Sequence, residues 1–439
     1  MLPLEETVKS GIILDVEVRQ TETSKTQPWP RPVARVWITM LFLITWLLYS
    51  ARMAMPVCAV TMATQFSWSK TDLGVVMSGF FYGYCLTQVL GGYASDRIGG
   101  ERVLLLSSTG WAFVTTVTPL LAHLSISPLI TMTTARFLMG LFQGVHYPSL
   151  ASVCAQRVGE GERGFVMGVI GCGSYLGVLF VGGLGSVILE LHSWEPVFTI
   201  VGLLSALWAF SVWQCRVTDT VAENASNSDS KSHPEHSVAF WLNLCMKPPV
   251  LSMFFTHLCY RAGHYTLLSW LPTFFKETYP HAKGWVFNVV PWFVAMVSSL
   301  LGGSLSKYLI KNGYCVSAVR KMMQFCSMGI SSIFLLLLCR NPSFLSAVVL
   351  VSAAIGLGTF NNSGVTVNVH DLAPSCAGAL YGVMNTCGAL SGILLVYFSG
   401  YLVELTQSWD VVFSLLTLVN VMGLSVFLLF GDAQRLDLD

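Results

Sequence analysis

The sequence has 439 residues, of which 54% are hydrophobic and only 11% charged, and its formal net charge is +1. A soluble domain carries about 25% charged residues, so this composition excludes a water-soluble globular protein and predicts an integral protein of the lipid bilayer. The near-neutral charge gives no indication of a nucleic-acid partner, and we expect none.

The chain begins with a polar segment, for which we expect a cytosolic tail over residues 1–35. Its first part, "MLPLEETVKSGIILDVEVRQ", contains several acids and no long apolar core. A secretory signal peptide needs such a core. We therefore do not interpret this segment as a signal peptide.

Twelve apolar stretches follow, each long enough for a helix that crosses the hydrocarbon core of a bilayer, which takes about 20 residues. The first six are expected at 36–63, 73–95, 103–122, 129–155, 165–190 and 194–215. The second six are expected at 248–275, 285–308, 320–340, 345–369, 377–404 and 411–430. The prediction is an all-α membrane protein with two six-helix lobes.

The two lobes, 36–215 and 248–430, are separated by a predicted cytosolic linker at 216–247. Residues 216–237 read "RVTDTVAENASNSDSKSHPEHS", which is rich in serine, asparagine and charge. This composition is typical of disordered segments, so we expect disorder here. Residues 431–439 are expected to form a cytosolic C-terminal tail.

Lysine and arginine are distributed unevenly between the two sides of this arrangement. With the N-terminus in the cytosol, 17 of the 24 lie on the cytosolic side, four on the opposite side and three inside helices. Cytosolic loops of membrane proteins carry an excess of these residues. We therefore predict that both termini and the linker are cytosolic.

Three motifs of the first lobe recur in the second, 211 to 215 residues later. The pairs are "GGYASDRIGG" with "GGSLSKYLIKNG", "GFVMGV" with "GALYGV", and "WEPVF" with "WDVVF". Such parallel repeats are typical of two-lobed secondary transporters. The pattern G-x-x-x-D-R-x-G at 92–99 resembles the loop signature of the major facilitator superfamily. The resemblance implies that fold and a gating role for Asp96 and Arg97.

Three arginines lie inside predicted helices, and no acid lies near the middle of any of the twelve. Arg52, Arg136 and Arg261 therefore lack a fixed counter-ion along the chain. A charge at the bilayer centre costs roughly 3 kcal/mol or more, and the arginine fork suits phosphate or carboxylate. We predict a binding site for an anion. Arg261 is close to the start of its helix, so snorkelling to the interface is an equal alternative there.

Other polar side chains of the predicted helices are candidates for substrate binding. Gln143 and Tyr147 share one helical face with Arg136, and Asn361 and Asn362 lie in the unusually polar run "FNNSGVTVN". Helix–helix contacts explain the asparagines equally well. Three intramembrane histidines are interpreted as packed polar residues, with proton relay as the alternative: His146, His257 and His264.

Enzymatic, metal and cofactor sites are not indicated. The 12 cysteines are scattered without a C-x-x-C pair, which excludes a zinc knuckle or a disulfide framework. The sequence contains neither G-x-x-x-x-G-K-[ST] nor H-E-x-x-H, the motifs of a phosphate loop and a zinc protease. We expect no catalytic residue, no metal and no cofactor.

Longer runs carry a family resemblance that extends from Val36 to Leu436. The runs "FFYGYCLTQVLGGYASDRIGG", "RFLMGLFQGVHYP" and "LSWLPTFF" resemble the vesicular anion and type I phosphate transporter family. The runs "LLYSARMAMPVC" and "VNVHDLAPSCAGALYGV" are similar to the vesicular nucleotide transporters of that family.

The resemblance implies uptake of ATP, and of ADP and GTP, into secretory vesicles or lysosomes. It implies a monomer that depends on a proton pump for an inside-positive membrane potential and is stimulated by chloride. Where related carriers have a proton-handling Glu and a His, this chain has Gln143 and Met77, which favours the potential-driven mode. A carrier of smaller organic anions such as glutamate, sialate or phosphate is the alternative. A channel is a third class, which the repeat disfavours.

Overall fold

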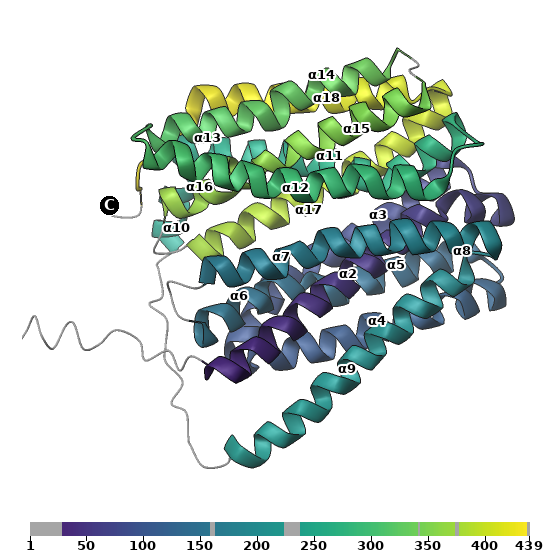
Figure 1. The fold of residues 1–439 in the computed structure, drawn as a ribbon, viewed down its shortest axis with the longest axis horizontal. Helices are drawn as coiled ribbons and strands as arrows, with labels where there is room; N and C mark the ends of the chain where they lie inside the picture. The colour runs from purple at the N-terminus through teal and green to yellow at the C-terminus, as the bar shows by residue number, and fades with distance from the viewer. Residues whose placement is uncertain (1–28, 159–162, 224–237, 341–342, 374–376, 437–439) are drawn as a thin grey trace, which may run out of the picture.

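The computed structural model describes residues 29–158, 163–223, 238–340, 343–373 and 377–436, and all regular secondary structure within them is helical. The helices form two bundles that lie side by side (Figure 1). One bundle comes from the first half of the chain and the other from the second half. The all-helical membrane fold predicted from the sequence is confirmed.

The helices of the first bundle are long and separated by short connections. They are α2 (Arg31–Phe66), α3 (Lys70–Ile98), α4 (Gly100–Leu124), α5 (Pro128–Gly144), α6 (His146–Arg157), α7 (Arg163–Phe180), the π-helical turn η1 (Val181–Gly185), α8 (Ser186–Leu191) and α9 (Glu195–Glu223). Because η1 joins α7 to α8 without a break, these three elements form one continuous rod.

The second bundle begins with a short helix and ends with the last long one. Its elements are α10 (Val238–Met246), α11 (Pro248–Thr278), α12 (Gly284–Lys311), α13 (Val316–Gln324), η2 (Phe325–Ile330), α14 (Ser331–Leu338), α15 (Phe344–Gly358), η3 (Thr359–Asn362), α16 (Val365–Leu372), α17 (Ala377–Thr406) and α18 (Asp410–Phe430).

The stretch predicted as the fourth spanning helix is divided in two. α5 ends at Gly144 and α6 begins at His146, so the interruption falls at Val145. Pro148 follows directly, and a proline has no N–H to donate to the carbonyl four residues earlier, with which its ring also clashes. This proline therefore explains why the helix is interrupted here.

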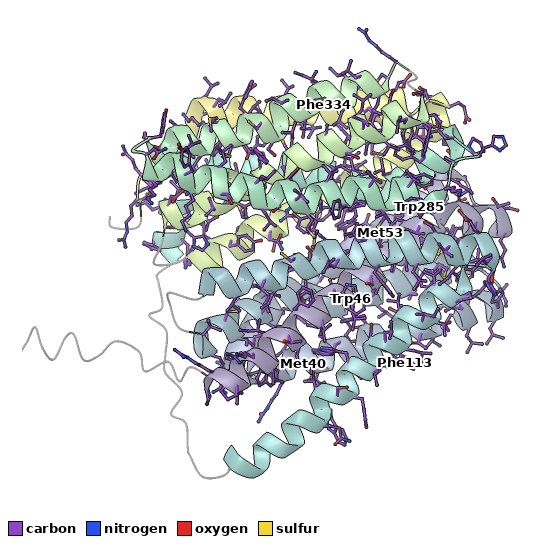
Figure 2. The ribbon with its side chains drawn as sticks, viewed as in Figure 1. Met40, Trp46, Met53, Phe113, Trp285 and Phe334 are labelled. Carbon is purple, nitrogen blue, oxygen red and sulfur yellow. The ribbon has the colours of Figure 1, made fainter. Side chains whose placement is uncertain are left out.

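Ten helical segments of the described chain are long and apolar enough to cross a membrane. The other two predicted spans are the interrupted pair α5–α6 and α11, which carries several histidine, arginine and lysine side chains. Large apolar side chains point outward from the bundles; Phe113, labelled in Figure 2, is 69% exposed. In a bilayer such faces contact lipid instead of water.

Helices extend into both ends of the predicted linker. α9 continues to Glu223, into the segment predicted to be disordered from residue 216, and α10 occupies Val238–Met246 at its other end. The N-terminal tail likewise gives way to helix at Arg31. Residues 224–237 lie outside the described part. Local composition did not show these helix extensions.

Repeat-related turns have matching backbone geometry. α3 is followed by Gly99 with φ +91°, and α12 is followed closely by Gly313 with φ +86°. Gly99 is the next-to-last residue of "GGYASDRIGG", and Gly313 is the last residue of "GGSLSKYLIKNG". Positive φ is accessible to glycine at little steric cost, which explains why a glycine stands at both turns.

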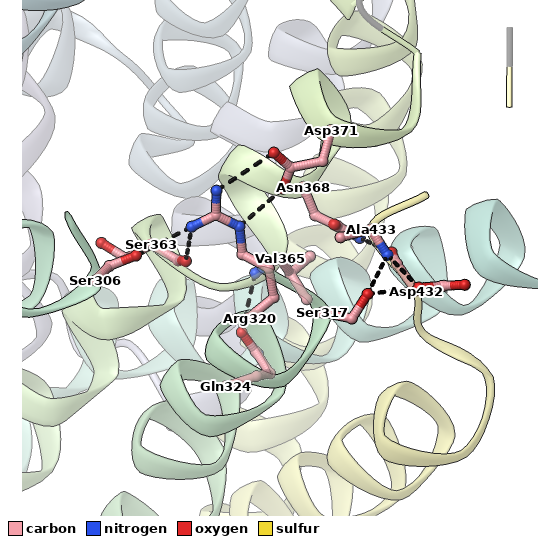
Figure 3. A network of polar contacts seen from close by, with 10 residues as sticks. All are labelled: Ser306, Ser317, Arg320, Gln324, Ser363, Val365, Asn368, Asp371, Asp432 and Ala433. Carbon is pink, nitrogen blue, oxygen red and sulfur yellow. Dashed lines mark hydrogen bonds and ion pairs between the residues drawn. The ribbon is translucent and has the colours of Figure 1, made fainter. Parts of the chain in front are cut away.

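One buried arginine of the second bundle ties four segments together (Figure 3). Arg320 donates from Nε and Nη2 to the two carboxylate oxygens of Asp371 at 2.8 and 3.3 Å, and from Nη1 to Ser306 and to the carbonyl of Ser363. All these contacts are at the end of the bundle at which the described chain ends. Arg320 is therefore a structural residue with its charge compensated.

The C-terminal segment after α18 packs against the same end. Ser317 donates to Asp432 Oδ1 at 2.5 Å, and this hydrogen bond lowers the pKa of the Asp432 carboxyl below its ordinary value. Asn368 donates to the Asp432 carbonyl, and the amide of Leu436 donates to the carbonyl of Leu372. Described residues of the predicted tail thus pack on the bundle.

Candidate functional site

A cavity of about 740 Å³ lies between the two bundles. Its walls come from α2, α3, α6 and α7 on one side and mainly from α11, α12, η3 and α17 on the other. Small-molecule sites have volumes of about 300–1,000 Å³. The lining reaches Met167 near the start of α7 and Lys307 near the end of α12, so the cavity extends toward the end where the described chain begins and ends (Figure 1).

The opposite end of the interface between the bundles is closed by polar contacts. Lys70 forms an ion pair with Glu277, and the amide of Thr71 donates to Glu404 Oε2 at 2.7 Å. A Cβ at Gly182 would lie only 2.4 Å from the carbonyl oxygen of Asn288, so the backbones touch there. The two bundles therefore touch at this end, and the cavity extends toward the other end.

The charged groups that line the cavity are cationic. Arg261 and Lys307 contribute to its wall, and no carboxylate does so among the described residues. Arg261 Nε donates to His257 Nε2 at 3.2 Å; because that ring nitrogen accepts, His257 is neutral. Snorkelling was the equal alternative for Arg261, but its side chain faces the cavity.

Arg52 lies one layer behind the cavity wall. It is 4% exposed, and both Nε and Nη2 donate to Gln143 Oε1 at 3.3 Å. Its guanidinium carbon lies 4.8 and 5.0 Å from the ring centroids of Tyr49 and Tyr84, two rings that line the cavity. Tyrosine rings therefore separate this charge from the cavity.

Arg136 is buried beside Arg52 without an acidic partner in the described part of the chain. It is 5% exposed, its Nη1 lies 3.4 Å from Met139 Sδ, and its Nε has no hydrogen-bond partner. Its guanidinium carbon is 5.1 Å from the centroid of Phe80, the same ring that Arg52 approaches at 4.6 Å. Two positive charges thus share one aromatic ring.

The other predicted substrate ligands divide into two groups. Tyr147 and Asn362 line the cavity; the Tyr147 hydroxyl donates to that of Tyr49 at 3.1 Å. Gln143 and Asn361 are fully buried and do not line it. Gln143 holds Arg52, and Asn361 bonds to Gln324 and Thr366 within the second bundle. Helix packing, left open as an alternative for the asparagines, accounts for Asn361.

Glycines of α3 and α5 allow these two helices to pack closely. A Cβ at Gly140 would lie 2.0 Å from the Phe80 carbonyl oxygen, and one at Gly83 would lie 2.1 Å from that of Phe137. α3 and α5 therefore pack backbone against backbone. This close approach positions Phe80 against both arginines.

The predicted gating pair lies at the end of α3. The Arg97 guanidinium stacks over the Tyr93 ring at 4.6 Å from its centroid. Asp96 is part of the helix, and its side chain lies outside the described part of the structure. The gating role of both residues stays a prediction.

Residues 41–395 match the sequence family described as the Major Facilitator Superfamily. The chain belongs to the Major Facilitator Superfamily. It is thus a multi-pass membrane transporter and not an enzyme, as the sequence predicted.

Several individual transporters are similar in sequence to this chain. The chain is 48% identical to the human voltage-gated purine nucleotide uniporter SLC17A9 over 96% of this chain and 97% of the relative. The mouse protein of the same name is 48% identical over 96% of this chain and 95% of the relative. The chloroplast ascorbate transporter of Arabidopsis thaliana is 28% identical over 93% of this chain and 77% of the relative. The predicted resemblance to nucleotide transporters is confirmed as homology.

A solved superfamily structure has the same fold. It is a bacterial homologue of the human lysosomal transporter Spinster in an inward-facing, occupied conformation. The TM-score is 0.70 with 16% identity, covering 91% of this chain and 97% of the other. At this identity the likeness concerns the fold alone.

Two features of the cavity were not singled out from the sequence. One is Lys307. The other is a group of five tyrosines that line the cavity together with Tyr84 and Tyr147: Tyr49, Tyr175, Tyr260, Tyr265 and Tyr381. Helical spacing contained a signal for the first, because Trp292, Ser299, Gly303 and Lys307 recur on one face of α12.

Proposed function

We propose that this chain is a uniporter for purine nucleotide anions that works by alternating access. The observation that carries the proposal is a cavity between the bundles that is lined by Arg261 and Lys307 and by no described carboxylate. An anion that enters supplies the missing negative charge. The 48% identity to the human voltage-gated purine nucleotide uniporter supports the choice of substrate.

The buried arginines extend the positive field of this site. Arg52 lies about 5 Å behind the rings of Tyr49 and Tyr84, and Arg136 lies next to it on the Phe80 ring. Charges at such distances interact strongly where water is excluded. We assign them to binding of the phosphates, with direct contact in a state where the tyrosine layer has moved.

The membrane potential is sufficient to drive accumulation. One charge that crosses 100 mV gains about 2.3 kcal/mol, so a nucleotide with about three to four negative charges gains about 7–9 kcal/mol. That corresponds to about five to six decades of concentration. Gln143 and Met77 do not titrate, which is consistent with transport that needs no coupled proton.

The proposed topology has twelve crossings, with lobes at 36–215 and 248–430 and both termini in the cytosol. The lysine and arginine distribution supports it, and the cavity then opens to the cytosol, where a vesicular carrier collects its substrate. We propose loading of secretory vesicles or lysosomes by a monomer that uses the potential of a proton pump and is stimulated by chloride.

A carrier for smaller organic anions is the second candidate. The 28% identity to a chloroplast ascorbate transporter favours it, since cationic cavities of this kind suit carboxylates as well as phosphates.

The deciding experiment measures labelled ATP uptake into liposomes that contain the purified protein, with an inside-positive potential and no pH gradient. Saturable uptake that disappears with the potential and is unaffected by glutamate, sialate and ascorbate would support the nucleotide uniporter. Uptake of one of these smaller anions without ATP uptake would instead support the carrier of smaller organic anions. Uptake that rises without saturation would indicate a channel.

A further inference from the structure

The wall of the cavity formed by α11 has two parallel stripes of different chemistry. Arg261 and Tyr265 are one helical turn apart on the first stripe, and Tyr260 and His264 are one turn apart on the second. The first stripe carries the positive charge, whereas the second is aromatic. All four residues line the cavity, so a ligand that spans both stripes meets a charged half and a planar, apolar half.

The aromatic stripe is continued by a tryptophan from the neighbouring helix. The ring centroids of Tyr260 and His264 lie 6.0 Å apart with the planes at 20°, and Trp292 on α12 meets His264 at 6.0 Å with perpendicular planes. Neither ring nitrogen of His264 has a hydrogen-bond partner among the described residues. Flat rings with free polar edges are suited to stacking and hydrogen bonding of a nucleobase.

A second, smaller cavity of about 40 Å³ lies behind these three rings and shares them with the large one. One water needs about 10–15 Å³, so this space accepts an exocyclic group but not a purine ring. Gly263 and Asn420 are also part of its lining. A Cβ at Gly263 would lie 3.6 Å from Asn420 Oδ1, so this glycine borders the side-chain oxygen of Asn420.

The amide of Asn420 has a defined orientation. Ser332 donates its hydroxyl proton to the Met328 carbonyl at 2.5 Å, and must therefore accept from Asn420 Nδ2, which lies 3.2 Å away. Oδ1 is left as an acceptor without a donor among the described residues. An acceptor in a small space beside aromatic rings matches an exocyclic amino group.

We propose that Tyr260, His264, Trp292 and Asn420 form a subsite for the base of the nucleotide, with the exocyclic amino group of adenine donating to Asn420 Oδ1. The phosphates then extend along the neighbouring stripe to Arg261. Guanine presents a carbonyl oxygen where adenine has the amino group, and two acceptors repel each other. The subsite therefore favours adenine over guanine. This inference rests on the proposed nucleotide transport.

The test uses the full-length protein in liposomes and compares inhibition of labelled ATP uptake by unlabelled ATP, GTP and inorganic tripolyphosphate. Stacking contributes enough that Trp292→Leu should weaken ATP binding about five- to hundredfold, whereas tripolyphosphate inhibits within twofold of the unsubstituted protein. Asn420→Leu should remove a preference for ATP over GTP of about two- to tenfold. Trp285→Leu is the matched control, because this tryptophan lies on the same helix outside the cavity and is 45% exposed.

Unchanged tripolyphosphate inhibition also shows that a variant is folded. Equal weakening of ATP and tripolyphosphate by Trp292→Leu, or an unchanged preference for ATP over GTP in Asn420→Leu, would overturn the subsite while nucleotide transport stands. If the unsubstituted protein takes up no nucleotide, both proposals are wrong. The measurement on the unsubstituted protein therefore comes first and distinguishes this outcome from failure of the subsite alone.

Discussion

Two regions of the molecule contain buried arginines, and they differ in whether a carboxylate compensates the positive charge. In the second bundle Arg320 is 8% exposed and binds both oxygens of Asp371 as well as Ser306 and Ser363. In the first bundle Arg52 and Arg136 are about as deeply buried, yet their described contacts are one glutamine oxygen, a methionine sulfur and aromatic rings. The first arrangement includes a carboxylate, whereas the second has none among the described residues.

The difference teaches how to separate structural from functional charges in a transporter. A buried ion pair costs desolvation but compensates its own charge, and removal of one partner leaves the other uncompensated. A buried arginine without an acid reduces stability until an external anion arrives. The proposed function therefore accounts for Arg52 and Arg136, whereas the ion pair with Asp371 accounts for Arg320.

The largest expected effect is the loss of transport on removal of an unpaired arginine. Arg136→Ala should lower potential-driven ATP uptake about hundredfold, because a charge-assisted interaction with phosphate is worth about 2–5 kcal/mol. Thermal unfolding of the same sample should show unchanged or increased stability. Normal uptake by a folded, correctly inserted variant would contradict the role assigned to Arg136.

The opposite pattern is expected for the paired arginine. Arg320→Ala should reduce the free energy of unfolding by about 3 kcal/mol, because Asp371 is left without its partner, while uptake per folded molecule changes little. Denaturation of the detergent-solubilised protein measures this. The double variant Arg320→Ala/Asp371→Ala is the control and should regain part of the lost stability; no recovery would contradict the ion-pair explanation.

A third variant gives an unpaired arginine of the first bundle a carboxylate partner. Gln143→Glu supplies Arg52 with a carboxylate, and hydrogen bonds to charged groups contribute about 1.5–3 kcal/mol. The variant should be at least as stable as the original protein and show uptake reduced about tenfold or more. Gln143→Leu, which adds no charge, is the matched control; equal uptake in the two variants would show that an internal counter-ion does not compete with the substrate.

The smallest effect is expected at the mouth of the cavity. Lys307 is exposed, so solvent and salt screen its charge. Lys307→Gln should raise the KM for ATP about two- to threefold without a change in maximal rate, and the difference should disappear at high ionic strength. A reduced maximal rate at unchanged KM would instead place Lys307 in the conformational cycle.

Much of the architecture follows from local properties of the sequence. Apolar stretches of about 20 residues predicted the spanning helices, because in lipid a helix satisfies its own backbone hydrogen bonds. The three intramembrane arginines were visible for the same reason, as charges in segments that otherwise contain almost none. The boundaries of the linker were missed, since a polar composition does not exclude the helical extension of α9 to Glu223.

What the sequence by itself determined is therefore a helical two-lobed carrier with an excess of buried positive charge. Only the tertiary structure decided which charges face the cavity. Arg261 and Lys307 reach the cavity, while Arg52 lies behind tyrosines and Gln143 is its partner. The physical reason is that the rotation of each helix about its axis is set by packing with its neighbours, such as the contact of Gly140 with Phe80. That rotation cannot be read from one helix alone.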